Sequence, residues 1–336
     1  MTAAATVPAP RVARNRGTRF WEEYRVEFAM LGALVLLSLV LTFAADNFLT
    51  ERNLRNVMWQ STAIGIVAIG QTLVILTAGI DLSVGGMAAV SAMVGGKAML
   101  ETNVATGIVV TLLVATFIGL VNGVFVAYGK LAPFIVTLGV LSICTSLTYV
   151  ISDQASITGL PDSYRQLGRG LVNLPIRDGG FAIQYYIFLF VALYVVGHVL
   201  LTRSKPGRFI YAIGSNEEAA RLSGVDVRLY KTLAYVASGL LCGVAALILS
   251  GRLGVIDPDN GSGWELQSIA GVVIGGTSLF GGKGSLVGTV IGVFLITVLN
   301  NGLNLLRVSS FWQGSAVGAV VILSVLLERV FRNRGA

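Results

Sequence analysis

The sequence predicts an all-α integral membrane protein with about ten transmembrane helices, some of them short or broken, and with both termini in the cytoplasm. Of the 336 residues, 54% are hydrophobic and only 12% are charged, whereas a soluble domain carries roughly 25% charged residues. Apolar runs such as 104–128 and 232–250 are apolar nearly all round, unlike the striped helices of soluble proteins. Because a bilayer offers the backbone no hydrogen-bond partners, such runs cross it as helices.

Ten segments are long enough, or nearly so, to cross a hydrocarbon core, which takes about 20 helical residues. They are residues 28–45, 57–78, 82–100, 104–128, 131–151, 181–201, 232–250, 266–280, 285–304 and 311–327. The third and eighth segments are short, glycine-rich or both, so we expect bent, tilted or only partly spanning helices there. Eight spans with two re-entrant segments would fit the sequence equally well.

Basic residues predict the orientation. Lys and Arg cluster before the first span, in the segment 202–231 and at the C-terminus, and cytoplasmic loops carry an excess of such residues. Ten alternating spans place all three clusters inside. The chain then divides into a basic N-terminal tail (1–27) with an interfacial helix, a transmembrane domain (28–328) and a basic C-terminal tail (329–336). The net charge of +7 has no aromatic-interleaved basic surface beside it, so no nucleic-acid partner is expected.

A short helix is predicted inside the cytoplasmic segment. Ser215 and Glu218 have the spacing of a capping box, which begins a helix, and Gly224 suits the position that follows its end. A helix of about two turns is too short to be stable alone. We therefore expect a groove, on this chain or on a partner, to hold it.

The same residues resemble the cytoplasmic signature of permease subunits of ATP-binding-cassette importers. The matching pattern is Glu218-Ala219-Ala220, three further residues and Gly224. The resemblance implies that the short helix docks into a cleft of a separate ATPase subunit and transmits its closure. The residues expected to carry this coupling are Ser215, Glu217, Glu218, Ala219, Ala220, Arg221 and Gly224.

Further stretches resemble the ribose-type sugar permeases within that class. They are residues 73–86, residues 270–285 and residues 299–305, and the resemblance runs from about residue 53 to residue 327. The family commonly has Gly where this chain has Ala78 and Ser where it has Gly86, which are both exchanges of one small residue for another.

The resemblance implies the function and the partners. The chain would be the permease subunit of an ATP-driven importer in a bacterial cytoplasmic (inner) membrane, moving a small neutral sugar by alternating access. A periplasmic or lipid-anchored solute-binding protein would deliver the sugar to the external segments 152–180 and 252–265, and two permease copies would enclose the path. This chain would bind no cofactor and would not be an enzyme, because the partner ATPase would use the ATP and Mg.

Polar residues inside the apolar spans are the candidates for the translocation path. They are costly in lipid and should face the bundle interior, where amides and hydroxyls suit a sugar. Bonding from helix to helix is an equally good interpretation for each of them. The candidates are Gln60, Gln71, Asp81, Asn122, Asn300, Asn301 and Asn304.

Asp81 is the acidic residue among these candidates, and an acidic residue inside a membrane suggests function. The predicted topology places Asp81 at the cytoplasmic end, between the second and third spans. There it would cap a helix beginning at Leu82, which we favour over a role in the path. The Gly-Gly-Lys-Gly-Ser run at 281–285 lacks the spacing of a phosphate-binding loop and predicts a tight turn.

Other functions fit less well. Proton coupling needs buried Asp, Glu or His, and the spans offer almost none besides Asp81, although sodium bound by backbone carbonyls stays open. No G-x-S-x-G or H-E-x-x-H motif supports an intramembrane enzyme. The alternatives are a permease for branched-chain amino acids or another small polar solute, and a sodium-coupled secondary transporter.

Overall fold

The computed structural model describes residues 25–174, 181–309, 312–320, 322–323 and 326. The C-terminal tail and nearly all of the N-terminal tail, with its predicted interfacial helix, lie outside these residues.

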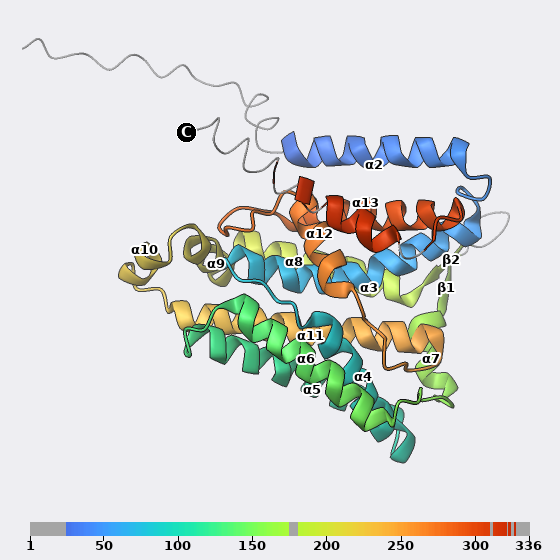
Figure 1. Ribbon diagram of the computed structural model, residues 1–336, viewed down its shortest axis with the longest axis horizontal. Coiled ribbons are helices and arrows are strands. Elements are labelled where there is room, and N and C mark those ends of the chain that lie inside the picture. The colour runs from blue at the N-terminus through green and yellow to red at the C-terminus, as the bar shows by residue number, and fades with distance from the viewer. Residues whose placement is uncertain (1–24, 175–180, 310–311, 321, 324–325, 327–336) are drawn as a thin grey trace, which may run out of the picture.

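Seven helices are long and apolar enough to cross a membrane, and Figure 1 shows them gathered into one bundle. They are α2 (Arg25–Ala44), α3 (Glu51–Leu76), α5 (Val104–Ala127), α6 (Pro133–Ser152), α8 (Tyr185–Arg203), α11 (Val227–Leu253) and α13 (Leu286–Leu305). The prediction of an all-α membrane protein is therefore confirmed. Residues 312–320, within the predicted tenth span, are also helical.

Two helices are shorter, at the places where the sequence predicted marginal spans. Helix α4 (Val84–Glu101) has 18 residues and is mostly buried, while α12 (Trp264–Ile274) has only 11 residues. At 1.5 Å per residue α12 is about 16 Å long, roughly half the thickness of a hydrocarbon core. The predicted helix at 266–280 therefore ends too late, because Gly276 has φ +87° and the Thr277 nitrogen donates to the Val272 carbonyl oxygen at 3.1 Å, which completes a Schellman turn.

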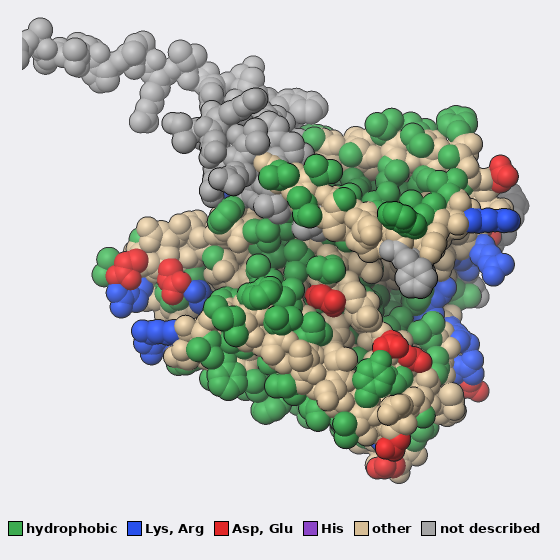
Figure 2. Space-filling view, in the orientation of Figure 1, with side chains coloured by type: hydrophobic (Ala, Val, Ile, Leu, Met, Phe, Trp, Pro, Cys, Tyr) green, Lys and Arg blue, Asp and Glu red, His purple; other side chains and the backbone are tan. Residues whose placement is uncertain are grey.

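Helix α11 lies at the centre of the bundle against α3, α4 and α5. Glycines allow these helices to approach closely. A Cβ on Gly119 of α5 would lie 3.1 Å from Cα of Gly239 on α11. Helices α2, α5, α6 and α8 instead expose large apolar side chains, including Phe43 at 87%. Figure 2 shows apolar side chains over the middle of the surface in view, and Lys and Arg mainly at its left and right ends.

One end of the bundle, which we call the α7 end, carries a small folded segment. It contains α7 (Asp162–Arg169) and two antiparallel strands, β1 (Leu171–Leu174) and β2 (Phe181–Gln184). The sixth span was predicted to begin at residue 181, but its helix begins at Tyr185. The reason is that residues 181–184 pair with β1 as an extended strand.

The opposite end, which we call the α10 end, carries two helices where the sequence predicted one. Helix α9 (Lys205–Ser215) precedes α10 (Glu217–Leu222), and both lie beyond the end of α8 (Figure 1). Ser204 caps α9 by accepting a hydrogen bond from the Gly207 nitrogen at 3.2 Å. The capping serine followed by a proline in the first turn was the local signal for α9.

Candidate functional site

The short helix predicted inside segment 202–231 exists as α10, but its capping residue differs from the prediction. The side chain of Asn216, rather than that of Ser215, accepts the capping bond from the Ala219 nitrogen at 2.9 Å. Ser215 is the last residue of α9, and its hydroxyl donates to the Tyr211 carbonyl oxygen at 2.8 Å. A capping residue needs an extended backbone, and Asn216 has it, with φ −162° and ψ 102°.

The end of α10 agrees with the sequence. Gly224 has φ +82°, the left-handed conformation typical of the residue after a helix. The nitrogen of Val225 donates to the carbonyl oxygen of Ala220 at 3.1 Å, which completes a Schellman turn. Gly224 is therefore needed for its backbone conformation, because no other atom lies within 4 Å of a Cβ built on it.

Charged side chains cover the outer face of α10. The guanidinium of Arg221 donates to the Glu218 carboxylate at 2.5 and 3.1 Å, and this bond holds the pKa of Glu218 below its ordinary value. Lys231 donates to Glu217 at 2.6 Å. The Arg221–Glu218 pair is solvent-exposed and contributes little to stability, whereas Lys231 is half-buried and Glu217 exposed, so the carboxylates of α10 remain available to a partner.

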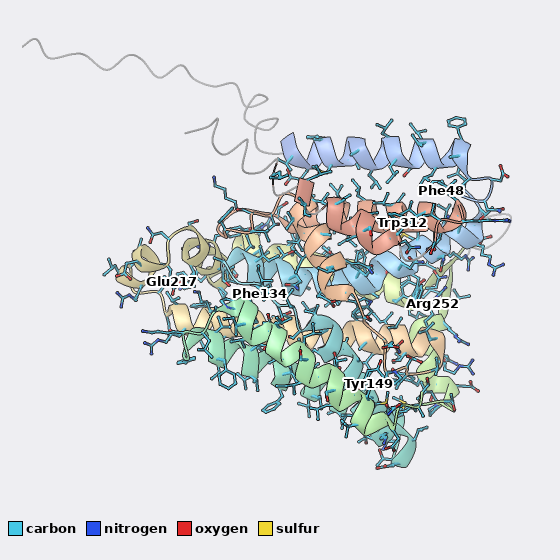
Figure 3. All side chains as sticks on the ribbon, in the orientation of Figure 1. Phe48, Phe134, Tyr149, Glu217, Arg252 and Trp312 are labelled. Atoms are coloured by element: carbon cyan, nitrogen blue, oxygen red, sulfur yellow. The ribbon has the colours of Figure 1, made fainter. Side chains whose placement is uncertain are left out.

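Helix α10 offers an apolar side chain as well as charges. Leu222 is 78% exposed, whereas Ala220 is buried, so one face of α10 is anchored and the other is free. Figure 3 places Glu217 at the extremity of the molecule. An open groove of about 350 Å³ lies beside the helix, and it is lined by Tyr128, Arg221, Val225, Asp226, Val227 and Arg228.

Asp81 lies in the non-helical segment that joins α3 to α4. It is fully buried, and its Oδ1 accepts hydrogen bonds from the nitrogen and the hydroxyl of Ser83, at 3.0 and 2.6 Å. Its Oδ2 accepts a third bond from the Ser238 hydroxyl of α11 at 3.0 Å. The prediction that Asp81 caps a helix beginning at Leu82 is wrong, because α4 begins at Val84 and its N-cap residue is Ser83.

Two amide side chains join this group, which we call the Asp81 cluster. Asn122 of α5 donates to the Ser83 hydroxyl at 2.8 Å, and Gln71 of α3 donates to the backbone oxygen of Asp81. The other amide oxygens, Oδ1 of Asn122 and Oε1 of Gln71, have no partner within the described part of the chain. The cluster contains Gln71, Asp81, Ser83, Asn122 and Ser238. It ties together α3, α4, α5 and α11.

The cluster lies deep in the bundle rather than at its cytoplasmic surface. Ser238 is near the middle of α11, which runs from Val227 to Leu253, so Asp81 lies at the same level. Among the residues that the structure describes, no Lys, Arg or His pairs with Asp81. The backbone nitrogen of Ser83 and the hydroxyls of Ser83 and Ser238 donate three hydrogen bonds to the carboxyl group of Asp81. These bonds offset the free-energy cost of burying it there.

The other path candidates lie apart from the cluster. Asn301 of α13 exchanges two hydrogen bonds with Asn53 of α3, at 2.9 and 2.8 Å, which is the helix-to-helix role. Asn300 is buried, and its Oδ1 has no partner in the described ranges. Asn304 is exposed and accepts from Gln313 at 2.7 Å, and Gln60 is half-buried. Sequence reasoning missed Asn53, Ser83 and Ser238, because small polar residues are common in packed helices.

The two predicted external segments come together at the α7 end. Arg169 of α7 donates to the backbone oxygens of Arg252 and Leu253, at 2.6 and 2.8 Å. The Arg252 guanidinium lies over the ring of Trp59, 4.5 Å from its centroid, and Tyr149 donates to Asp259 at 2.5 Å. Figure 3 shows Arg252 and Tyr149 in the half of the molecule that faces away from Glu217.

Comparison with known proteins identifies the family. Residues 53–326 match the family described as the permease component of branched-chain amino acid transport systems. The chain is 41% identical over 300 residues to the ribose import permease protein of Bacillus subtilis, which covers 88% of this chain and 90% of the relative.

Two further relatives match over similar lengths. The ribose import permease protein of Escherichia coli K12 is 37% identical over 311 residues, covering 92% of this chain and 95% of the relative. The D-allose transport system permease protein of the same organism is 35% identical over 314 residues, covering 93% of each.

These matches include the stretches 73–86, 270–285 and 299–305, on which the predicted resemblance rests, so that prediction is confirmed. Together with the seven apolar helices, they make the protein a multi-pass component of the inner membrane. The chain therefore belongs to this permease family, as a membrane-spanning transport component of an ATP-binding-cassette importer.

Proposed function

We propose that the chain carries a small neutral sugar, a pentose, hexose or sugar alcohol, across the inner membrane. The observation that carries this proposal is the identity of 35 to 41% to permeases named for ribose and allose, over about nine-tenths of the chain. The family description names branched-chain amino acids, and such a solute is the second candidate. A sugar needs neutral hydrogen-bonding groups, and Gln71, Asn122 and Asn300 have buried amide oxygens with no partner in the part of the chain described here.

The proposed topology puts the α10 end in the cytoplasm and the α7 end outside. Counting α4, α12 and the helix that includes residues 312–320, ten segments would enter the membrane, and both termini would lie inside. The basic residues of segment 202–231 support this orientation. The exposed apolar faces of α5, α6 and α8 would contact lipid, and a second copy of the chain would complete the path.

The proposed partners occupy the two ends. A separate ATPase subunit would hold α10 in its cleft and would use the ATP and Mg, while this chain would bind no cofactor and catalyse no reaction. A periplasmic or lipid-anchored solute-binding protein would dock at the α7 end, where the side chains of Arg165 and Arg169 line an open groove. No nucleic acid would take part.

The mechanism would be alternating access. Closure of two ATPase subunits would displace the α10 helices toward each other, and the bundles would rock from one open state to the other. The solute would then leave on the cytoplasmic side, and ATP hydrolysis would reset the ATPase. The ATPase would shift the equilibrium between the two open states by binding one of them more tightly. A partner that binds both states equally leaves their populations unchanged.

Uptake by proteoliposomes tests the proposal. The permease is reconstituted with its ATPase subunit and its solute-binding protein, and radiolabelled ribose, allose and leucine are compared. We expect ATP-dependent uptake of a sugar that requires all three proteins. Uptake by the permease alone would support a secondary transporter instead, and uptake of leucine without sugar would support the amino-acid alternative.

A further inference from the structure

The last turn of α9 meets two other segments at backbone distance. The nitrogen of Gly282 donates to the carbonyl oxygen of Leu76, the last residue of α3, at 3.0 Å. Gly214 of α9 lies against this bond, and a Cβ built on Gly214 would overlap both the Leu76 oxygen and the Gly282 nitrogen. We call Leu76, Gly214 and Gly282 the Gly214 junction. Residues of any other type at position 214 would force the three backbones apart.

Contacts from the turn that contains Gly282 are equally close. A Cβ on Gly281 would lie 3.0 Å from the Gly214 Cα and 2.9 Å from the Ala78 nitrogen, and a Cβ on Gly282 would lie 2.7 Å from the Ser215 nitrogen. Both glycines have positive φ, +83° and +71°, so the turn needs them for its conformation as well as for space. Backbone groups packed this closely cannot shift independently, so a displacement of one segment displaces the others.

Helix α9 is also fastened to α10. Ile213 of α9 packs with Ala220 of α10 and Val227 of α11 in a small apolar cluster, and only Asn216 separates the two helices in sequence. On its other side Ile210 belongs to the main core of the bundle. A displacement of α10 therefore reaches α9 through packed side chains, and Figure 1 shows α9 between α10 and the ends of the long helices.

The two segments that α9 touches are the non-helical interruptions of the bundle. Residues 77–83 follow Leu76 and carry Asp81 with its cluster, and residues 275–285 separate α12 from α13. Tyr211 of α9 adds a hydrogen bond of 2.8 Å to the carbonyl oxygen of Gly284. Helix α9 thus contacts both interruptions, the first at Leu76 and the second at Gly282 and Gly284.

We propose that Gly214 is a positioning residue for ATP coupling, which lets α9 press directly on the Leu76 and Gly282 backbones so that displacement of α10 moves both interruptions together. This inference rests on the proposed function, in which α10 docks with the ATPase. Sequence reasoning assigned coupling to Ser215 and to α10 and did not include Gly214. The junction adds the step between the docking helix and the interior of the bundle.

The test is Gly214→Ala in the complete complex, with uptake and ATP hydrolysis measured in the same proteoliposomes. We expect ATPase association and hydrolysis to persist while sugar uptake per ATP hydrolysed falls about ten-fold, the size of a typical coupling energy between sites. The control is Gly197→Ala on α8, where a Cβ would meet only side-chain atoms of Leu286 and Ile69. That variant should keep the wild-type ratio.

An unchanged ratio of uptake to ATP hydrolysis in Gly214→Ala would overturn the proposal. A parallel loss of uptake and hydrolysis would also overturn it, because it indicates a merely structural role. If Gly214→Ala does not reach the membrane, Tyr211→Phe decides. It removes the bond to Gly284 without adding atoms, and we expect uptake per ATP to fall about five-fold; an unchanged ratio again overturns the proposal. Failure of the proposed function is distinguishable from failure of the Gly214 proposal. If the proposed function were wrong, the wild-type chain itself would transport without the ATPase or would not associate with it.

Discussion

The Ser238 hydroxyl of α11 donates a hydrogen bond of 3.0 Å to the buried carboxyl group of Asp81, 157 positions earlier in the chain. Asp81 belongs to the interruption between α3 and α4, so this bond holds that interruption against the central helix. Ser83 supplies the other two donors to the same carboxyl group. The bond is therefore part of what keeps a non-helical segment in place inside a membrane bundle.

We expect Ser238→Ala to destabilise the protein. Removal of this donor leaves one buried oxygen of Asp81 without its partner, which costs about 2 kcal/mol. Thermal unfolding of the detergent-purified protein measures the change. Ser142→Ala on the exposed surface of α6 removes a hydroxyl that bonds only the Leu138 carbonyl, and it should leave the melting temperature unchanged. Equal effects of the two substitutions would show that the bond to Asp81 is not special.

Exchange of Ala78 for glycine should stabilise the protein. Ala78 is exposed and has φ +60°, a conformation that costs a residue with a Cβ about 1 kcal/mol or more. Ala78→Gly should therefore raise the free energy of unfolding by about 1 kcal/mol. The same exchange at exposed Ala192, within α8, should lower it by about 1 kcal/mol. Shifts of the same sign in the two variants would contradict this explanation.

Gly224→Ala tests the turn that ends α10. Because the glycine has φ +82° and open space around it, the substitution acts only through the backbone, at a cost of about 1 kcal/mol. We expect weaker association with the ATPase subunit and lower uptake, with the permease still present in the membrane. Gly139→Ala has equally open space inside a helix, and it should transport normally. Gly224→Asp and Glu218→Lys, which also change the charge of α10, should abolish uptake.

Leu222→Asp tests the apolar contact of α10 with its partner. Since Leu222 is 78% exposed, the fold should tolerate the substitution, while the loss of an apolar anchor should weaken ATPase association about ten-fold. Co-purification with the ATPase subunit at several salt concentrations measures the effect. Leu49→Asp is the matched control, because Leu49 is 61% exposed and lies between α2 and α3, away from α10. A similar loss in both variants would show that the effect is not specific to α10.

Much of the fold follows from local patterns. The long apolar runs predict the seven long helices, and the spacing from Glu218 to Gly224 predicts a short helix with its terminal turn, because both depend on residues adjacent along the chain. One boundary that failed depends on a distant partner, because residues 181–184 form a strand only when β1 pairs with them. The other, the end of α12, is set locally by Gly276 with φ +87° and by the Schellman turn around it.

Membership of an importer permease family and the short helix α10 could be inferred from the order of residues alone, since motif and capping chemistry are short-range properties. The partners of Asp81, the role of Asn301 against Asn53 and the meeting of Gly214 with Leu76 and Gly282 emerged only in three dimensions. The physical reason is that a side chain's hydrogen bond or a glycine's close approach depends on which helix packs beside it. That packing brings together residues from opposite ends of the chain.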